Sequence, residues 1–259
     1  MCLIAWNWQP DSATPLLLLG NRDEFYARTA TPVHWWEPTR DGAAVLAGKD
    51  LQAGGTWLGL SQSGRLAALT NYRTVVPART NTPSRGELVA GFLQSDLDAR
   101  DYLEQLAQHA GDYNPFNLLV FDGKQLLGLE SRGAKVLTLQ AGVGGVSNAD
   151  FQTPWPKLTQ LKARLQTQVD RQATDPQSLL PLLHDKAMAA DAALPQTGVP
   201  QALERILSAA FIASPDYGTR ACSVIALHQT HAEFTEQSFD ARGLVGSQQL
   251  MFHLSGLKP

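Results

Sequence analysis

Short apolar runs separated by turn residues constrain this chain most, because that pattern predicts antiparallel strands from the start. Residues 2–9 are apolar and aromatic, residues 9–13 (Gln-Pro-Asp-Ser-Ala) have turn chemistry, and residues 16–20 form a second buried run. The pattern recurs in residues 56–61 and 66–70, which flank a Gln-Ser-Gly-Arg turn. The chain therefore begins inside a sheet, and Asn71 lies at the end of a predicted strand.

Helical and strand patterns then alternate in blocks. Ser84-Arg-Gly-Glu87 has the form of a capping box and predicts a helix, and a second helix is predicted from about Asp98. Short turns separate predicted strands at 116–121, 125–130 and 136–139, and the glycine-dense stretch 141–148 predicts a loop. Later helices are predicted from Pro156, Asp175 and Pro200, and closing strands near 221–228, 232–239 and 250–254.

This order of elements favours an α+β fold with two antiparallel sheets flanked by helices. A doubly wound parallel sheet would need strict alternation of strand and helix, which the chain lacks. We find no internal repeat and no linker rich in Gly, Ser or Pro, so the sequence predicts one domain over residues 1–259.

Composition excludes several classes of partner. Lys and Arg number 21 against 24 Asp and Glu, a net charge of −3, which argues against nucleic acid. Purely apolar runs such as 16–19 are far shorter than the roughly 18 residues that a membrane span needs, so no span is expected. The N-terminus lacks the features of a secretory signal, and a cytoplasmic location is expected. Two cysteines, Cys2 and Cys222, exclude a disulfide scaffold.

Cys2 is the first candidate for chemistry. Removal of Met1 would leave one residue with a thiol and a free α-amine, which titrate near about 8.5 and about 8. The amine could then act as the base for its own sulfur. The alternative is that Cys2 is only the first buried residue of a strand.

Polar motifs interrupt the ends of the apolar strands, and each alone is typical of a turn. In chain order they are Asn21-Arg-Asp-Glu24, Gly54-Gly-Thr-Trp-Leu-Gly59, Thr70-Asn-Tyr-Arg73, Ser84-Arg-Gly-Glu87, Val146-Ser-Asn148 and Tyr217-Gly-Thr-Arg220. Together the six resemble the NRDE family, also called the transport and Golgi organisation 2 family. That family is similar to N-terminal nucleophile (Ntn) hydrolases of the penicillin V acylase and bile salt hydrolase type, which implies a four-layer αββα sandwich.

The resemblance also implies roles for individual residues. Cys2 would be the nucleophile, Asp23 would hold the α-amine, and Asn71 would supply the oxyanion hole. Asn148 would orient substrate or amine, and Arg220 would place a guanidinium near the thiol, favouring the thiolate. Arg22, Trp57 and Tyr72, from the same motifs, are expected to bind substrate. One departure is that Gly20 stands where the acylases have an Arg three residues before the Asp.

Other features favour simpler interpretations. His34-Trp35-Trp36 is expected to form an exposed or half-buried aromatic loop. His228 and His231 have no third ligand in the sequence pattern, so no metal site and no cofactor are expected. Gly142-Val-Gly-Gly145 lacks the context of a phosphate loop and is expected to deliver Asn148. Cys222 is expected to be a buried strand residue.

Two functions of different classes follow. The first is an Ntn-hydrolase-like amidase or acyltransferase that uses Cys2 on a small amide or acyl conjugate. The alternative is a non-catalytic binding or trafficking protein for an acyl-CoA, a lipid or a haem-like ligand. The fold alone does not discriminate between them.

Overall fold

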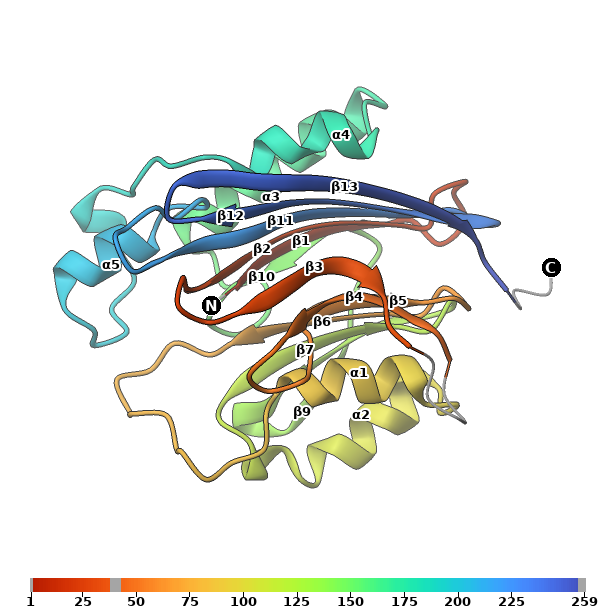
Figure 1. Ribbon diagram of the computed structural model, residues 1–259, viewed down its shortest axis with the longest axis horizontal. Helices are drawn as coiled ribbons and strands as arrows, with labels where there is room; N and C mark the ends of the chain where they lie inside the picture. The colour runs from red at the N-terminus through yellow and green to blue at the C-terminus, as the bar shows by residue number, and fades with distance from the viewer. Residues whose placement is uncertain (1, 38–42, 256–259) are drawn as a thin grey trace.

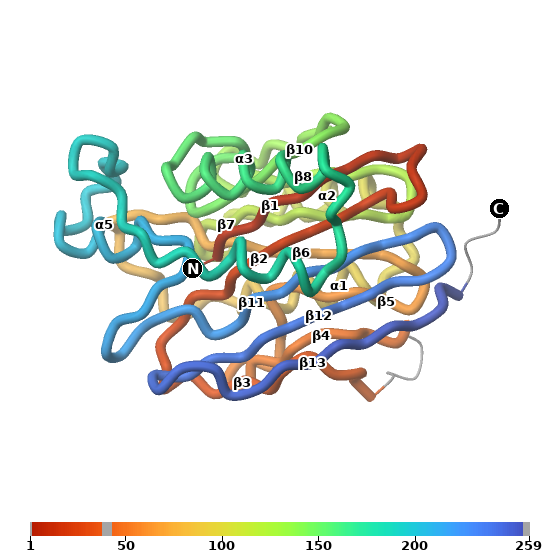
Figure 2. The backbone as a smooth tube through the Cα atoms, turned by 90° about the horizontal axis from the view of Figure 1, so that it is seen from above, coloured from red at the N-terminus to blue at the C-terminus, as the bar shows by residue number. Residues whose placement is uncertain are grey.

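The computed structural model describes residues 2–37 and 43–255 and contains two antiparallel sheets packed face to face (Figure 1). The six-stranded sheet has the order β10 (Gly142–Val146), β1 (Cys2–Trp8), β2 (Leu16–Phe25), β11 (Tyr217–Leu227), β12 (His231–Asp240), β13 (Gly243–His253). The seven-stranded sheet has the order β3 (Ala30–Trp35), β4 (Val45–Asp50), β5 (Leu58–Ser61), β6 (Leu66–Asn71), β7 (Phe116–Phe121), β8 (Leu126–Glu130), β9 (Lys135–Thr138). Figure 2 shows the long strands β2, β11, β12 and β13 running side by side across the molecule.

Helices cover the outer faces of both sheets, which gives four layers in the order αββα (Figure 1). The helices are α1 (Gly86–Gln94), α2 (Ala99–Ala107), α3 (Pro156–Asp170), α4 (Pro176–Leu179) and α5 (Gln201–Leu207), with 3₁₀ turns at η1 (Ala110–Asp112), η2 (Ser131–Gly133), η3 (Leu180–Leu183) and η4 (Asp191–Ala193). The first two helices pack on the seven-stranded sheet, and α3 and α4 pack on the six-stranded sheet. Within the described part of the chain, no helix is both long and apolar enough to cross a bilayer.

Alternation along the strands divides the apolar side chains among three cores. Ile4 and Trp6 of β1 point between the sheets, whereas Leu3 and Ala5 point toward α3, and all four are fully buried. This double burial explains why β1 is a continuous apolar run instead of an alternating one. The predicted fold class is confirmed.

Two expected strand boundaries are wrong because polar motifs lie inside strands, and one predicted loop is a strand. Asn21–Glu24 continues β2 instead of following it, and Tyr217–Arg220 opens β11 instead of preceding it; the two motifs pair with each other. The predicted glycine loop is strand β10, paired with β1. A Cβ at Gly144 would lie 2.4 Å from the Trp6 ring, so glycine there serves close packing of a strand.

Two further predictions are corrected. His34 and Trp35 belong to β3, an edge strand that contains Pro32 and therefore resembles a loop in sequence. The capping box does not form, because the Ser84 hydroxyl accepts a hydrogen bond from the Gly86 amide instead of the Glu87 amide, and the Glu87 carboxylate accepts one from the Tyr113 hydroxyl at 2.7 Å.

Candidate functional site

A cavity of about 820 Å³ is lined by residues of both sheets at the end of the molecule where β1 begins. Segment 79–86, which leads into α1, contributes another part of its wall. Six of the eight predicted site residues line it: Cys2, Arg22, Asp23, Trp57, Asn71 and Arg220. Tyr72 and Asn148 are outside the lining.

Cys2 begins β1 and pairs with Arg22 of β2, so the two side chains emerge on the same face of the sheet. The cysteine is 6% exposed. Burial raises the pKa of its thiol to about 11, the charge of Asp23 adds to this, and the charge of Arg22 opposes it. The thiol is therefore protonated near neutral pH. Met1 lies outside the described residues, so its removal stays a prediction.

Arg22 is held by an acidic residue of the other sheet. Its Nη2 lies 3.2 Å from Oδ2 of Asp50, and Nε of Arg28 lies 2.5 Å from the same oxygen. Burial opposes ionisation of Asp50, but hydrogen bonds from Arg28 and from backbone amides hold its pKa below the usual range. The ion pair fixes the Arg22 guanidinium in the cavity wall beside Cys2.

Asp23 is the next residue of β2, and it is 1% exposed. Its Oδ1 accepts a hydrogen bond from the Thr219 hydroxyl at 2.8 Å. Burial raises its pKa, and the charge of Lys157 opposes the rise. Because Cys2 pairs with the preceding Arg22, Asp23 stands one position beyond that pair, beside the N-terminal end of β1.

Lys157 is a residue that the sequence analysis missed. It lies in the first turn of α3, is 3% exposed, and its Nζ has no hydrogen-bond partner among the described residues. Burial lowers its pKa to about 8, and the negative charge of Asp23 counters that. No sequence pattern marks it, because a lysine in a helix is ordinarily exposed.

Asn71 ends β6 and lines the cavity from the sheet opposite Cys2. Asn148, fully buried after β10, donates a hydrogen bond from Nδ2 to the Asn71 carbonyl at 2.9 Å, and its own carbonyl accepts one from the Arg73 amide at 2.7 Å. Asn148 thus bridges the two sheets behind Asn71 and orients the strand end that carries it.

Arg220 lies at the bulge in β11 and donates hydrogen bonds to main-chain carbonyls. Nε bonds the Phe239 carbonyl at 3.0 Å, and Nη1 bonds the carbonyls of Phe25, Tyr26 and Arg28 at 3.0–3.2 Å. These contacts brace the turn that follows β2. The arginine charge that lowers the pKa of the Cys2 thiol is instead that of Arg22, the residue opposite Cys2.

Trp57 explains the departure at Gly20. A Cβ at Gly20 would lie 3.0 Å from the Trp57 ring, so the indole fills the space where the resemblance implies an arginine side chain. Tyr72 does not line the cavity, and the Arg132 guanidinium lies 4.7 Å from the centre of its ring.

A buried ion pair near Asn71 was also missed. Nη1 of Arg73 lies 2.5 Å from Oε2 of Glu204, and both side chains are less than 5% exposed. The Arg73 guanidinium also stacks on Trp155 at 4.5 Å. Arg73 belongs to a noted motif, which was a usable signal, but Glu204 is 131 residues away in sequence and nothing local points to it.

The predicted family resemblance is confirmed by comparison with known sequences. A family profile described as Transport and Golgi organisation 2 matches residues 1–241. The chain is 38% identical over 261 residues to a Transport and Golgi organization protein 2 homolog of Bos taurus, covering 92% of this chain and 93% of that protein. A Homo sapiens homolog is 34% identical over 261 residues with the same coverage.

Solved structures with a similar fold include hydrolases. A variant of the conjugated bile acid hydrolase from Clostridium perfringens is similar with a TM-score of 0.56 and 10% identity, covering 98% of this chain and 92% of that one. A Caenorhabditis elegans ortholog of N-acylethanolamine-hydrolyzing acid amidase has a TM-score of 0.52 and 10% identity, covering 87% and 92%. At this identity the likeness shows a shared Ntn-hydrolase fold.

Proposed function

This chain belongs to the transport and Golgi organisation 2 family, and we propose that it is an amidase or acyltransferase of the Ntn type that uses Cys2 on a small amide or acyl conjugate. The observation that carries the proposal is the position of Cys2 at the start of β1, in the wall of a cavity that Asn71 lines from the opposite sheet. A carbonyl bound between them would meet a nucleophile on one side and a side-chain amide donor on the other.

In the proposed reaction, Met1 is first removed, and the α-amine of Cys2 accepts the proton of its thiol. The sulfur attacks the carbonyl carbon, and the negative charge that develops on the oxygen is stabilised by Nδ2 of Asn71. The C–N bond then breaks, the leaving amine takes the proton back, and water or an acceptor amine releases the acyl group from sulfur. Asp23 holds the protonated α-amine in this scheme, and Arg22 stabilises the thiolate.

The geometry of the neighbours supports these roles. Asp23 of β2 lies beside the N-terminal end of β1, where a free amine of Cys2 would be, and Arg22 is the cation opposite Cys2. Arg220 supports the cavity through the turn that contains Arg28, whose side chain shares Asp50 with Arg22. The two solved neighbours are, by their names, a hydrolase of conjugated bile acids and an ortholog of an acid amidase that hydrolyses N-acylethanolamines.

The test combines intact mass with covalent trapping. We expect the mature protein to lack Met1, and an activated acyl amide or thioester to add one acyl group to Cys2. Cys2→Ala should abolish the adduct and Cys222→Ala should keep it, because Cys222 is fully buried in the core beneath α3. Retention of Met1 together with absence of any Cys2 adduct would overturn the proposal.

One observation favours the second candidate, a binding or trafficking protein. The raised pKa of Cys2, about 11, describes a thiol that is unreactive until something lowers it. Arginines in the cavity wall, including Arg85, suit the phosphate or carboxylate of an acyl-CoA or lipid. The described lining residues include no histidine, methionine or tyrosine. Of the side chains that usually bind haem iron, Cys2 is therefore the only one that a haem-like molecule would meet among them.

Titration with palmitoyl-CoA separates the binding function from the enzymatic function. In the binding function, Cys2→Ala should bind palmitoyl-CoA as tightly as the unmodified protein, and Arg85→Gln should weaken binding about tenfold, because a charge-assisted hydrogen bond is lost. In the enzymatic function, palmitoyl-CoA should instead acylate Cys2 and release free CoA with time.

A further inference from the structure

The hairpin between β11 and β12 gathers three potential metal ligands at the end of the six-stranded sheet remote from Cys2. His228 and His231 flank a two-residue turn, and the His228 amide donates to the His231 carbonyl at 2.9 Å. Glu233 follows two residues later and therefore lies on the same face as His231. The structure thus supplies the third group that the sequence pattern of the two histidines lacked.

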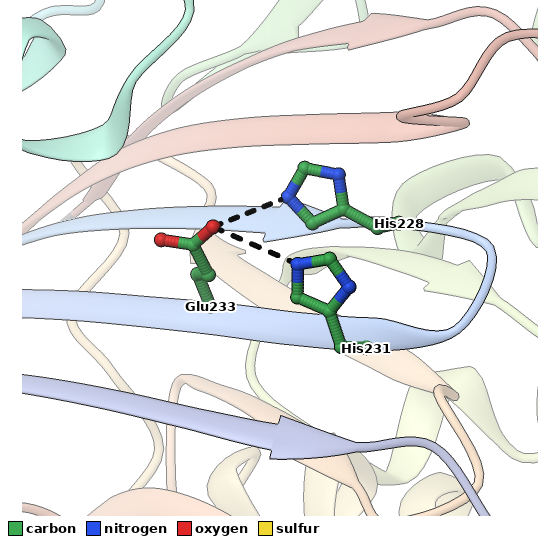
Figure 3. Close-up of side chains that lie close together, drawn as sticks. All are labelled: His228, His231 and Glu233. Carbon is green, nitrogen blue, oxygen red and sulfur yellow. Dashed lines mark ion pairs between the residues drawn. The ribbon is translucent and has the colours of Figure 1, made fainter.

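All three side chains converge on one point (Figure 3). Oε1 of Glu233 lies 3.4 Å from Nε2 of His228 and 3.8 Å from Nε2 of His231, and the three ligand atoms lie within 4.8 Å of one another. Ligands about 2.1 Å from a tetrahedral ion are about 3.4 Å apart. The two rings are stacked with centroids 4.2 Å apart, so the rings would have to turn for both Nε2 lone pairs to point at a common ion.

The other ring nitrogens have the partners that metal-binding histidines use. Nδ1 of His228 is 3.0 Å from the Thr14 hydroxyl, and Nδ1 of His231 is 3.4 Å from the Thr230 hydroxyl. A proton held on Nδ1 leaves the lone pair on Nε2, which faces Glu233. Nε2 of His228 is buried and makes no hydrogen bond among the described residues.

From this cluster we propose a binding site for a divalent transition-metal ion such as Zn²⁺, with His228, His231 and Glu233 as its protein ligands. Two imidazoles and one carboxylate suit zinc and neighbouring transition metals, whereas Ca²⁺ and Mg²⁺ prefer oxygen ligands only. The ion would join the end of β11 to the start of β12, and Thr14 would tie it to the turn before β2.

The site is separate from the cavity. Ala221 lines the cavity, and His228 is seven residues further along the same extended segment, about 23 Å away at the rise of a strand. The proposal therefore stands or falls independently of the chemistry at Cys2.

The test is equilibrium dialysis of the full chain against Zn²⁺, in a Cys2→Ala background so that the cavity thiol cannot bind the metal. We expect one equivalent of Zn²⁺ per chain. His231→Ala and Glu233→Gln should lose this binding, and Thr14→Val should weaken it about tenfold, the effect of removing an outer-shell partner. His109→Ala is the matched control and should leave binding unchanged. The His109 side chain is 72% exposed and lies between α2 and η1, in the helical layer that covers the other sheet.

Substitution with Co²⁺ supplies a second readout. Strong visible absorption of the Co²⁺ protein that disappears in Glu233→Gln would support a four-coordinate site built on this carboxylate. Equal Zn²⁺ binding by the parent, His231→Ala and Glu233→Gln proteins, each verified as folded by circular dichroism, would overturn the proposal. Absence of a stoichiometric site in the parent would do the same, leaving a cluster of two histidines and a glutamate that binds no metal.

Discussion

The two ends of the six-stranded sheet carry polar clusters built in different ways. At the Cys2 end, Asp23 and Lys157 are almost fully buried and come from segments 134 residues apart. At the hairpin end, His228 and Glu233 are five residues apart and their side chains are 24% and 16% exposed. One cluster depends on the whole fold, whereas the other depends mainly on one tight turn.

This difference determines how strongly each cluster shifts pKa values and how much a substitution there changes the free energy of unfolding. Buried charges lose hydration, so the Cys2 end has strongly shifted pKa values and depends on close partners. Water screens the hairpin end, so breaking a contact there costs little. We therefore expect large effects at the first end and small ones at the second.

The largest effect is expected at the buried ion pair beside Asn148. Arg73→Met should lower the free energy of unfolding by about 3–5 kcal/mol, because Glu204 would keep a buried charge without its partner. Urea unfolding measures this. Arg205→Met is the matched control, since its pair with Asp191 is half exposed, and its effect should be near zero. Equal losses in the two variants would mean that burial does not distinguish these pairs.

The next largest effect is expected on catalytic turnover at the cavity. If the chain cleaves amides, Asn71→Ala should lower kcat about a hundredfold, because the developing oxyanion loses its side-chain donor. The fold should persist, since Asn148 bonds the Asn71 carbonyl and not its side chain. Steady-state kinetics on an acyl amide measures it, with Gln105→Ala, an exposed residue of α2 outside the cavity lining, as control. A change in KM alone would assign Asn71 to substrate binding.

The buried Lys157 should make the free energy of unfolding depend on pH. Its folded pKa is about 8, below the ordinary 10.5, so the unfolded chain binds more protons between these values. Its destabilising contribution is full below about pH 8 and disappears as pH rises toward 10.5. The free energy of unfolding of the parent protein should therefore rise by about 2 kcal/mol between pH 8 and pH 10 through this group, and Lys157→Met should lack that rise. Urea unfolding at several pH values checks this. An equal rise in the two proteins would mean that Lys157 does not cause it.

The smallest effect is expected at the hairpin. In the presence of a chelator, Glu233→Gln should change the free energy of unfolding by less than about 1 kcal/mol, because its contacts with the two histidines are partly exposed. Thermal unfolding with and without EDTA measures it. A loss as large as that of Arg73→Met would remove the contrast between the two ends.

Local patterns were enough to predict much of the fold. The β5–β6 hairpin and the β7–β9 meander are encoded by apolar runs and the turn residues between them, which act over a few positions. The same local signals predicted α2 with its Asp98 cap, whose carboxylate accepts a hydrogen bond from the Asp101 amide. Motif order also identified the family and six residues that line one cavity.

The sequence by itself thus determined the strands, the turns and the residues that gather near Cys2, because each depends on neighbours along the chain. Only the tertiary structure decided that Gly144 is in a strand, since the Trp6 ring must lie against it. It also decided that Lys157 is buried near Asp23 and that Glu233 completes the group with His228 and His231. Burial and charge pairing arise between segments brought together by folding, and periodicity along the chain does not encode them.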